Sequence, residues 1–320
     1  MNPSATMPRS SAQGYVDDPR NDDVVVYVDG KFVPRNQAVV SVFDSGFVLG
    51  DGIWEGLRLV NGRVVALDQH MDRLYEGTRA IALDIGMTRD ALVAAIRATL
   101  DKNGMVDGAH VRLMVTRGRK STPNQDPRFA LGRATIVIVA EYKTPNPEVK
   151  ASGLALFTSA FRCSGPDVFD LRLNSHSRLN LIQALIQAIK AGAHEALMLD
   201  PHGFVASCNS TNFFIVRDDE VWTSTGRYNF MGITRRHLIE LCARNGILVR
   251  ETDFTLAQCY GADEAFATGT FGGVTRVSRI DGRVIGRSHG SRSDGPGPLT
   301  QRLAGLYAGL VAAAAARGRP

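Results

Sequence analysis

The order of strand and helix patterns along the chain is the feature that most constrains its fold. Residues 24–34 (VVVYVDGKFVP) predict two strands joined by an Asp-Gly turn, and residues 109–118 and 133–142 predict two more strands. A helical pattern precedes the second of these segments, with Thr88 as its N-cap and Gly104 as its C-terminal stop. Because strands and helices mix without regular alternation, we predict an α+β architecture.

The length of 320 residues is sufficient for two domains. Residues 1–22 are rich in Ser, Pro, Asp and Asn and predict a disordered tail. Residues 143–153 are polar, contain two prolines and predict a linker. We therefore expect a small N-terminal α+β domain over residues 23–142 and a larger C-terminal domain over residues 154–320.

Composition and cysteine spacing argue against several classes of protein. The net charge is +5 and no long basic run occurs, so we expect no nucleic-acid partner and a preference for small anionic ligands. The cysteines at 163, 208, 242 and 259 form no CxxC pair and no zinc motif, which is typical of reduced thiols in a cytosolic protein. Neither a secretory leader nor a long apolar segment is present, so we expect a cytoplasmic protein without a membrane anchor or metal.

Three short segments have the chemistry to bind a phosphate. The residues GIT precede a predicted helix, so that the backbone N–H groups of Ile233 and Thr234 would lie at its positive end. The residues TGT at 268–270 supply a hydroxyl and backbone donors, and Arg73 on another predicted helix supplies a forked cation. A helix start is more often only a cap, and the spacing of these segments does not prove that they converge.

Eight blocks of sequence occur in an order that is similar to one enzyme family. They are YVDGKFVP, GDGIWEGLRLVNGRVVALDQHMDRL, VRLMVTRG, AGAHEALMLDPHGFV, NFFIV, GITR, DEAFATGT and GPLTQRL. The blocks resemble the fold-type IV pyridoxal-phosphate enzymes, which include branched-chain aminotransferases, D-amino-acid aminotransferases and aminodeoxychorismate lyases, and the resemblance extends over roughly residues 24–306. The resemblance implies two domains with pyridoxal phosphate between them, an amino acid or 2-oxo acid as substrate, and a homodimer with active sites completed across its interface.

The resemblance also assigns roles to individual positions of this sequence. The positions that match cofactor-binding residues are Arg73 of HMDRL, Ile233 and Thr234 of GIT, Thr270 of TGT, and Ser207 and Asn212 of VASCNSTNFF. The positions that match the substrate side of branched-chain enzymes are Trp54, Arg58, His110 and Arg112. The phosphate-binding set agrees with the anion site inferred from local chemistry.

This sequence departs from the family at its reactive positions. The Schiff-base lysine of the family falls at Asn174 of RLNSHSRLN, and an amide neither forms an imine nor carries a proton at neutral pH. The glutamate that faces the pyridine nitrogen falls at Ser207, whose neutral hydroxyl cannot hold that nitrogen protonated. A frequent tyrosine falls at Arg178. Lys190, Lys143 and Lys150 lie at a helix end or in the linker, and none is a convincing replacement.

Other groups near position 174 have both catalytic and plain structural interpretations. His176 would share one face of an extended segment with Asn174 and could act as a general base, or it could simply bond to the backbone. Arg178 and Arg112 could each bind a substrate carboxylate or lie at the surface. Trp54 fits either a pocket wall or the core, and Cys208 is expected to be an inert thiol.

Our leading hypothesis is therefore a class IV aminotransferase-like protein that binds pyridoxal phosphate non-covalently and lacks ordinary transamination. Asn174 and Ser207 together suggest a changed chemistry. One alternative is a lyase, isomerase or hydrolase that uses His176, Arg178 or Arg112 on a small anion. The other is a catalytically silent binding dimer.

Overall fold

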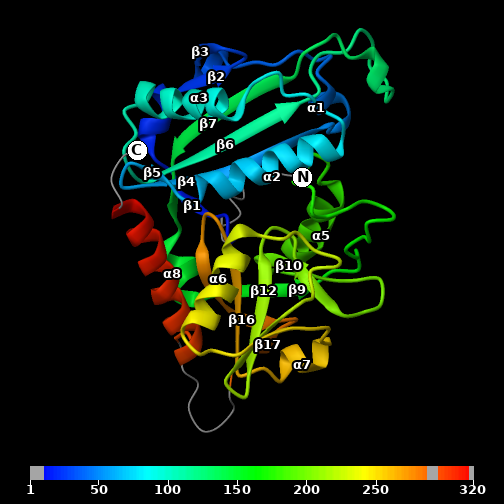
Figure 1. The fold of residues 1–320 in the computed structure, drawn as a ribbon. Coiled ribbons are helices and arrows are strands. Elements are labelled where there is room, and N and C mark those ends of the chain that lie inside the picture. The colour runs from blue at the N-terminus through cyan, green and yellow to red at the C-terminus, as the bar shows by residue number, and fades with distance from the viewer. Residues whose placement is uncertain (1–10, 287–294, 317–320) are drawn as a thin grey trace. The chain divides into compact units, whose positions relative to one another are not determined.

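The computed structural model describes residues 11–286 and 295–316, which divide into two compact units. Unit 1 comprises the described parts of 1–16, 144–171 and 180–308. Unit 2 comprises those of 17–143, 172–179 and 309–320. Both units combine helices with sheets, which confirms the predicted α+β class (Figure 1).

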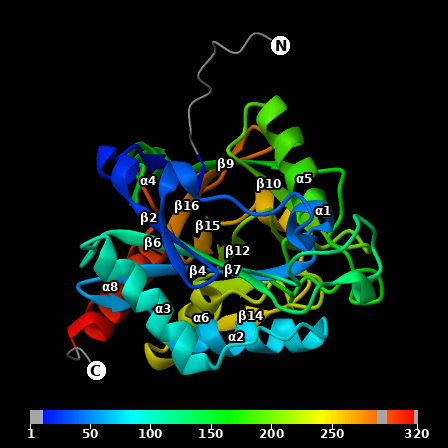
Figure 2. The ribbon, with the colours of Figure 1, turned by 90° about the horizontal axis from the view of Figure 1, so that it is seen from above.

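Unit 2 is built on an antiparallel sheet with the strand order β3-β2-β7-β6-β4-β5. Its strands are β2 (Val25–Val28), β3 (Lys31–Pro34), β4 (Gly52–Val60), β5 (Arg63–Val64), β6 (Ala109–Thr116) and β7 (Thr135–Tyr142). Its helices are α1 (Ser45–Leu49), α2 (Leu67–Ala80) and α3 (Arg89–Lys102). Helices α2 and α3 lie along one side of the sheet in both views (Figures 1 and 2).

The local signals predicted for this unit are confirmed. Asp29 and Gly30 have φ values of 47° and 90° and form the turn between β2 and β3. The Thr88 side chain accepts a hydrogen bond from the backbone N–H of Ala91 and caps α3. Inward-facing residues of β4 and β6, such as Leu57, are fully buried against α2 and α3.

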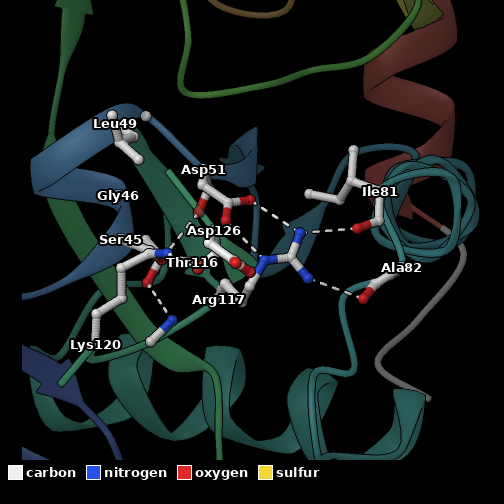
Figure 3. Close-up of polar contacts among 12 residues, drawn as sticks. Ser45, Gly46, Leu49, Asp51, Ile81, Ala82, Thr116, Arg117, Lys120 and Asp126 are labelled. Carbon is white, nitrogen blue, oxygen red and sulfur yellow. Dashed lines mark hydrogen bonds and ion pairs between the residues drawn. The ribbon is translucent and has the colours of Figure 1, made fainter. Parts of the chain in front are cut away.

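A polar network fixes the chain just before β4 begins (Figure 3). The Arg117 guanidinium donates to both Asp51 carboxylate oxygens at 2.7 and 3.0 Å, and to the carbonyl oxygens of Ile81 and Ala82 at 2.8 and 2.9 Å. The buried Lys120 amine donates to the carbonyl oxygen of Asp126 at 2.8 Å and closes the hairpin between β6 and β7. The start of β4 is therefore held by charge-assisted hydrogen bonds.

Unit 1 contains a larger mixed sheet with the strand order β11-β10-β9-β16-β15-β12-β13-β14, to which β17 adds beside β16. Its strands are β9 (Leu154–Thr158), β10 (Glu195–Leu199), β11 (Val205–Cys208), β12 (Asn212–Arg217), β13 (Glu220–Thr223), β14 (Val249–Glu251), β15 (Glu264–Gly269), β16 (Gly273–Ile280) and β17 (Arg283–Val284). The short strands β1 (Tyr15–Val16) and β8 (Thr144–Pro145) pair separately. The helices from residue 144 onward are α4 (Pro147–Ser152), α5 (Leu179–Lys190), α6 (Ile233–Arg244), α7 (Leu256–Tyr260) and α8 (Pro298–Ala316).

Helix α5 packs through small residues and exposes its large apolar ones. Ala184 and Ala188 are fully buried against a cluster that includes Met198 of β10. Its apolar residues at helical spacing are largely exposed: Leu179, Ile182, Ile186 and Ile189 are 68%, 50%, 45% and 39% exposed. This face is therefore unusually apolar for a surface.

Two segments predicted to lack structure are ordered. The disordered-tail prediction does not hold for residues 11–22, because β1 pairs with β8 and the Asn21 side chain exchanges hydrogen bonds with the backbone of Tyr142. Residues 1–10 lie outside the described residues. The predicted linker at 143–153 contains β8 and α4, the latter capped by Asn146.

A third difference concerns the segment at 172–179, which was predicted to belong to the C-terminal domain. It groups with unit 2, because its backbone pairs with the start of β4. We also expected Thr234 to be the N-cap of the following helix, but the helix begins two residues earlier, at Ile233, with Gly232 as its N-cap. No helix in the described part of the chain is long and apolar enough to cross a membrane.

Candidate functional site

The segment around Asn174 is attached to strand β4 by backbone hydrogen bonds. The N–H of Trp54 donates to the carbonyl oxygen of Asn174 at 2.9 Å, and the N–H of His176 donates to that of Gly52 at 3.0 Å. Ile53 and Ser175 form an antiparallel bridge between these bonds. Residues 174–176 thus run antiparallel to the start of β4, so that Asn174 and His176 fall on one side of this short stretch.

Both ends of the Asn174 amide are occupied by protein groups. Its nitrogen donates to the carbonyl oxygen of Trp54 at 2.5 Å, and its oxygen accepts a hydrogen bond from the Arg178 guanidinium. The side chain is almost completely buried. Asn174 is therefore a fixed structural contact, and its chemistry provides neither a nucleophile nor a titratable proton.

Arg178 belongs to a group of buried cations around the Trp54 ring. Its guanidinium carbon lies 5.7 Å from the ring centroid, and that of Arg112 lies 3.7 Å from it. Burial, together with the charges of Arg73 and Arg112, lowers the pKa of Arg178 to about 10. Burial also lowers the pKa of Arg112. These cations favour occupation of the site by an anion.

The predicted substrate-side residues lie on one face of the unit 2 sheet. Cross-strand pairing places Arg58 opposite His110, and Gly56 opposite Arg112, while Trp54 lies two residues before Gly56 on β4. A side chain at Gly56 would lie within 3.5 Å of both the His110 and Trp54 rings. Burial and the nearby Lys143 charge lower the pKa of His110 to about 3, so this imidazole is neutral at physiological pH.

His176 is a neutral imidazole with one unengaged ring nitrogen. Burial and the charge of Arg112 lower its pKa, while a hydrogen bond to the backbone of Ile53 opposes that shift. Its Nε2 atom is buried and has no hydrogen-bond partner within the described ranges. A buried nitrogen in this state has the chemistry of a proton acceptor.

Arg73 is held by a buried carboxylate that the sequence predictions missed. Both Glu55 oxygens accept hydrogen bonds from Arg73 at 2.7 Å, and one lies 2.7 Å from Nδ1 of His70. Burial by itself would raise the pKa of Glu55, but these bonds together hold it below its usual value. The signal in the sequence was the three-residue spacing of His70 and Arg73, which places them on one face of α2.

The predicted phosphate loop in unit 1 lies at the start of helix α6. Gly232 provides no side-chain cap, so the first backbone N–H groups, including those of Ile233 and Thr234, are available to a ligand. The Asn212 side chain accepts from the Gly232 N–H at 3.2 Å and donates to the carbonyl oxygen of Phe230 at 2.7 Å. Asn212 therefore sets the position of this helix start.

Thr268, which belongs to the predicted TGT segment, completes this arrangement, although the resemblance assigned the phosphate contact to Thr270. Thr268 pairs directly with Asn212 across β12 and β15, so their side chains share one face of the sheet. Its hydroxyl is buried without a hydrogen-bond partner among the residues described. Thr270, which was predicted to bind phosphate, is more exposed and lies two residues further along. We call Asn212, Gly232–Thr234 and Thr268–Thr270 the phosphate cup.

Ser207 does not reproduce the chemistry of a carboxylate. Its hydroxyl donates to the carbonyl oxygen of Thr211 at 2.8 Å, and the Asn212 amide lies 3.5 Å from it. The neighbouring Cys208 thiol is inert, because burial raises its pKa well above the ordinary value.

Comparison with known proteins identifies the family. The family model for amino-transferase class IV matches residues 52–280. This chain belongs to that family. The match includes Trp54, Asn174, Ser207 and the phosphate cup.

Relatives and solved structures agree with this assignment. Branched-chain-amino-acid aminotransferase-like protein 2 of Arabidopsis thaliana is 38% identical over 92% of this chain, which spans about half (51%) of that plant protein. A putative branched-chain-amino-acid aminotransferase of Methanocaldococcus jannaschii is 39% identical over 81% of this chain and 89% of its own length. The crystal structure of a branched-chain aminotransferase from Thermoproteus uzoniensis with norvaline has a TM-score of 0.78 and 30% identity, and the match covers 89% of this chain and 93% of that one.

For a class IV protein, these residues fit only part of the expected cofactor. The open helix start, the Asn212 anchor and the unpartnered Thr268 hydroxyl suit a phosphate group. The groups at 174 and 207 suit neither a covalent bond to the aldehyde nor a protonated pyridine nitrogen. The predicted site residues thus fall into two sets. Unit 2 contains Trp54, Arg58, Arg73, His110, Arg112, Asn174, His176 and Arg178, and unit 1 contains Ser207, Asn212, Ile233, Thr234 and Thr270.

Proposed function

We propose that this class IV protein holds pyridoxal phosphate non-covalently through the phosphate cup, binds a small carboxylate or phosphate anion, and does not catalyse ordinary transamination. The observation that carries this proposal is the Asn174 side chain, whose amide is bonded to Trp54 and to Arg178. When bound, pyridoxal phosphate supplies an aldehyde and an electron sink. The residues of this chain offer no amine at position 174 to react with that aldehyde.

The cations of unit 2 support the anion-binding part of the proposal. Arg112 stacks on Trp54, and Trp54 is itself held by a bond from its indole N–H to the carbonyl oxygen of Ser175 at 3.1 Å. A planar guanidinium fixed in this way is suited to a carboxylate, which it can bind through two parallel hydrogen bonds. Amino acids and 2-oxo acids are the substrates that the resemblance implies. The role of Arg73 in phosphate binding stays a prediction from the same resemblance.

His176 favours a second candidate function, which is lyase, isomerase or hydrolase chemistry on the bound anion. Its unpartnered Nε2 is positioned to accept a proton, and the pKa shift keeps the ring neutral at physiological pH. General-base catalysis by such a group contributes typically 10²–10⁴-fold to rate. Arg112 and Arg178 would orient the substrate and stabilise negative charge that develops on it.

A cytoplasmic homodimer is also part of this proposal. Ile182 and Ile186 of α5 are 50% and 45% exposed in unit 1, and Val39, Val42 and Phe47 are 76%, 66% and 71% exposed in unit 2. Apolar surface of this extent is suited to an interface with a second copy. Light scattering of the purified protein should give twice the chain mass.

Three measurements on the unmodified protein test the proposal. Added pyridoxamine 5'-phosphate should bind more tightly than pyridoxamine, because only the former fills the phosphate cup. The protein with pyridoxal phosphate should show no borohydride-stable adduct at position 174. Aminotransferase assays with branched-chain and D-amino acids should give little turnover, and efficient turnover in any of them would refute the proposal.

A further inference from the structure

The glycine-rich turn that follows Thr268 is held from outside the phosphate cup by two segments predicted to be a linker and a disordered tail. This turn, Gly269–Gly273, joins β15 to β16, and Gly269 and Gly273 pair with each other at its base. It includes Thr270 of the cup. Glycines alone do not fix a backbone conformation, because they are the most flexible residues. The contacts that surround the turn therefore decide which conformation a ligand meets.

The first segment is helix α4, which contributes Lys150. Its Nζ donates to the carbonyl oxygen of Gly272, to that of Val274 at 2.8 Å and to the hydroxyl of Thr275 at 2.9 Å. The carbonyl oxygen of Gly272 and the N–H of Gly273 belong to one planar trans peptide and point in opposite directions. The bond from Lys150 therefore also fixes the direction of the Gly273 N–H, away from Lys150.

The second segment is residues 11–16, which we call the N-terminal strap. The Ala12 N–H donates to the buried Glu195 carboxylate at 3.1 Å, and the same carboxylate accepts from Thr211 at 2.9 Å, next to Asn212 of the cup. The strap lies against the turn, because a side chain at Gly272 would come within 3.2 Å of the Ala12 carbonyl oxygen. Pairing of β1 with β8 ties the strap to the residues just before α4.

A third contact comes from helix α8. The Tyr307 hydroxyl lies 3.3 Å from that of Thr234, and its ring would lie 3.3 Å from a side chain placed at Gly273. Tyr307 thus touches both the turn and the start of α6. The turn has little space for side chains on these sides, so its shape depends on the clamp formed by Lys150, the strap and Tyr307.

We propose that Lys150 is a positioning residue of the phosphate cup, which acts by fixing the Gly269–Gly273 turn against the N-terminal strap in a conformation that accepts a phosphate monoester. The inference rests on the proposed function of the cup. It assigns a binding role to α4 and to residues 11–16, neither of which contacts the phosphate itself. The chemical class of the ligand is a phosphate monoester, for which pyridoxamine 5'-phosphate serves as the probe.

Calorimetric titration of the full chain with pyridoxamine 5'-phosphate and with pyridoxamine tests this role. Lys150→Met should weaken binding of the phosphorylated probe by about tenfold, as expected for loss of charge-assisted hydrogen bonds, and should leave binding of pyridoxamine unchanged. Lys150→Arg should retain most of the affinity, because a guanidinium can reach the same carbonyl groups. Lys190→Met is the matched control, since this lysine lies in the exposed last turn of α5.

A second variant tests the strap without changing the turn. Ala12→Pro removes the one N–H that donates to Glu195 and should also weaken the phosphorylated probe selectively. The clamp is overturned if Lys150→Met binds that probe as tightly as the wild type, or if it weakens both probes equally. If the wild type binds both probes equally tightly, the proposed phosphate binding by the cup is wrong, and the positioning role of Lys150 that rests on it is wrong as well.

Discussion

The guanidinium of Arg178 donates a hydrogen bond to the side-chain oxygen of Asn174, so two of the three positions at which the family resemblance implies a departure are in direct contact. An asparagine oxygen accepts that bond, whereas a lysine ammonium would face a second buried cation. The two departures therefore support each other. Asn174 gives Arg178 an acceptor, and Arg178 makes a return to lysine at 174 unfavourable.

The Asn174→Lys variant tests this coupling. It should lower the free energy of unfolding by about 2 kcal/mol, because Arg178 loses one of its buried acceptors and gains a basic neighbour. The adjacent cation should keep the new amine largely neutral, so that added pyridoxal phosphate gives a visible absorbance band and a borohydride-stable adduct at 174. Full transamination is not expected, because by the family resemblance Ser207 replaces the glutamate that would hold the pyridine nitrogen protonated.

Arg178→Tyr provides the other half of a double-mutant cycle. The double variant Asn174→Lys/Arg178→Tyr should be more stable than the Asn174→Lys single variant in urea denaturation, since the new amine no longer has to give up its proton beside a buried cation. If the changes in the free energy of unfolding from the two single variants add up to that of the double variant, the two positions are independent.

Arg112 should carry much of the affinity for anions. Arg112→Ala should weaken binding of small 2-oxo acids by about tenfold or more. Arg112→Lys should retain only part of the wild-type affinity, because an ammonium does not stack on the Trp54 ring as a planar guanidinium does. Affinity of the wild type should fall as salt rises. Titrations at two salt concentrations measure both effects, and equal affinities for wild type and Arg112→Ala would place the anion elsewhere.

Glu55 should be a large contributor to the stability of unit 2. Glu55→Gln leaves Arg73 and His70 without their shared carboxylate, and loss of one partner of a buried pair costs about 3–5 kcal/mol. The Glu55 pKa is lowered in the folded state, so its contribution is present above the unfolded value of about 4.3 and is lost as pH falls through the folded pKa. Acid unfolding monitored by circular dichroism should accordingly be less steep in Glu55→Gln.

Most of the fold was predictable because the local signals agreed with one another. The Asp-Gly turn at 29–30 and the Thr88 cap require little tertiary information. Residues 11–22 and 143–153 were mispredicted because their order comes from distant contacts. Asn21 bonds to Tyr142, and Lys150 bonds to the turn after Thr268. Polar composition does not reveal partners more than a hundred residues away.

In the candidate site, too, the features set by local sequence were predicted and those set by distant contacts were not. The positions of Asn174 and Arg178 were predicted from aligned motifs, but their mutual hydrogen bond depends on the exact path of a non-helical segment. The TGT segment was predicted, but Thr270 was named in place of Thr268, because only the pairing of β12 with β15 shows that Thr268 shares a face with Asn212. Glu55 was missed because a carboxylate in a strand gives no sign of the helix residues that it will face.

His110 should make the protein less stable in acid. Its folded pKa is lowered to about 3, whereas an unfolded histidine titrates near 6.5. Between these values the unfolded chain binds a proton that the folded chain does not, so the free energy of unfolding falls as pH decreases. His110→Gln should flatten this dependence between about pH 6 and pH 4 in chemical denaturation, and an unchanged slope would assign the acid sensitivity to other groups.

His176 decides between a reactive site and a silent one. Calorimetry with a panel of 2-oxo acids, amino acids and phosphorylated metabolites should first identify an anion that binds the wild type and is turned over. The His176 ring forms a hydrogen bond to the backbone of Ile53, and its Nε2 has no partner within the described residues. His176→Asn keeps an N–H near the place of Nδ1 but has no atom at the place of Nε2. This variant should bind the anion with affinity close to the wild type, because Arg112 and Arg178 are unchanged, and should lose turnover by about 10²-fold or more.

His176→Ala is the control for this prediction and should lose turnover equally. A similar unfolding midpoint in both variants would show that the loss of turnover does not come from a loss of fold. Retained turnover in His176→Asn would remove the general-base role, and the absence of any binding ligand in the wild type would favour a catalytically silent dimer.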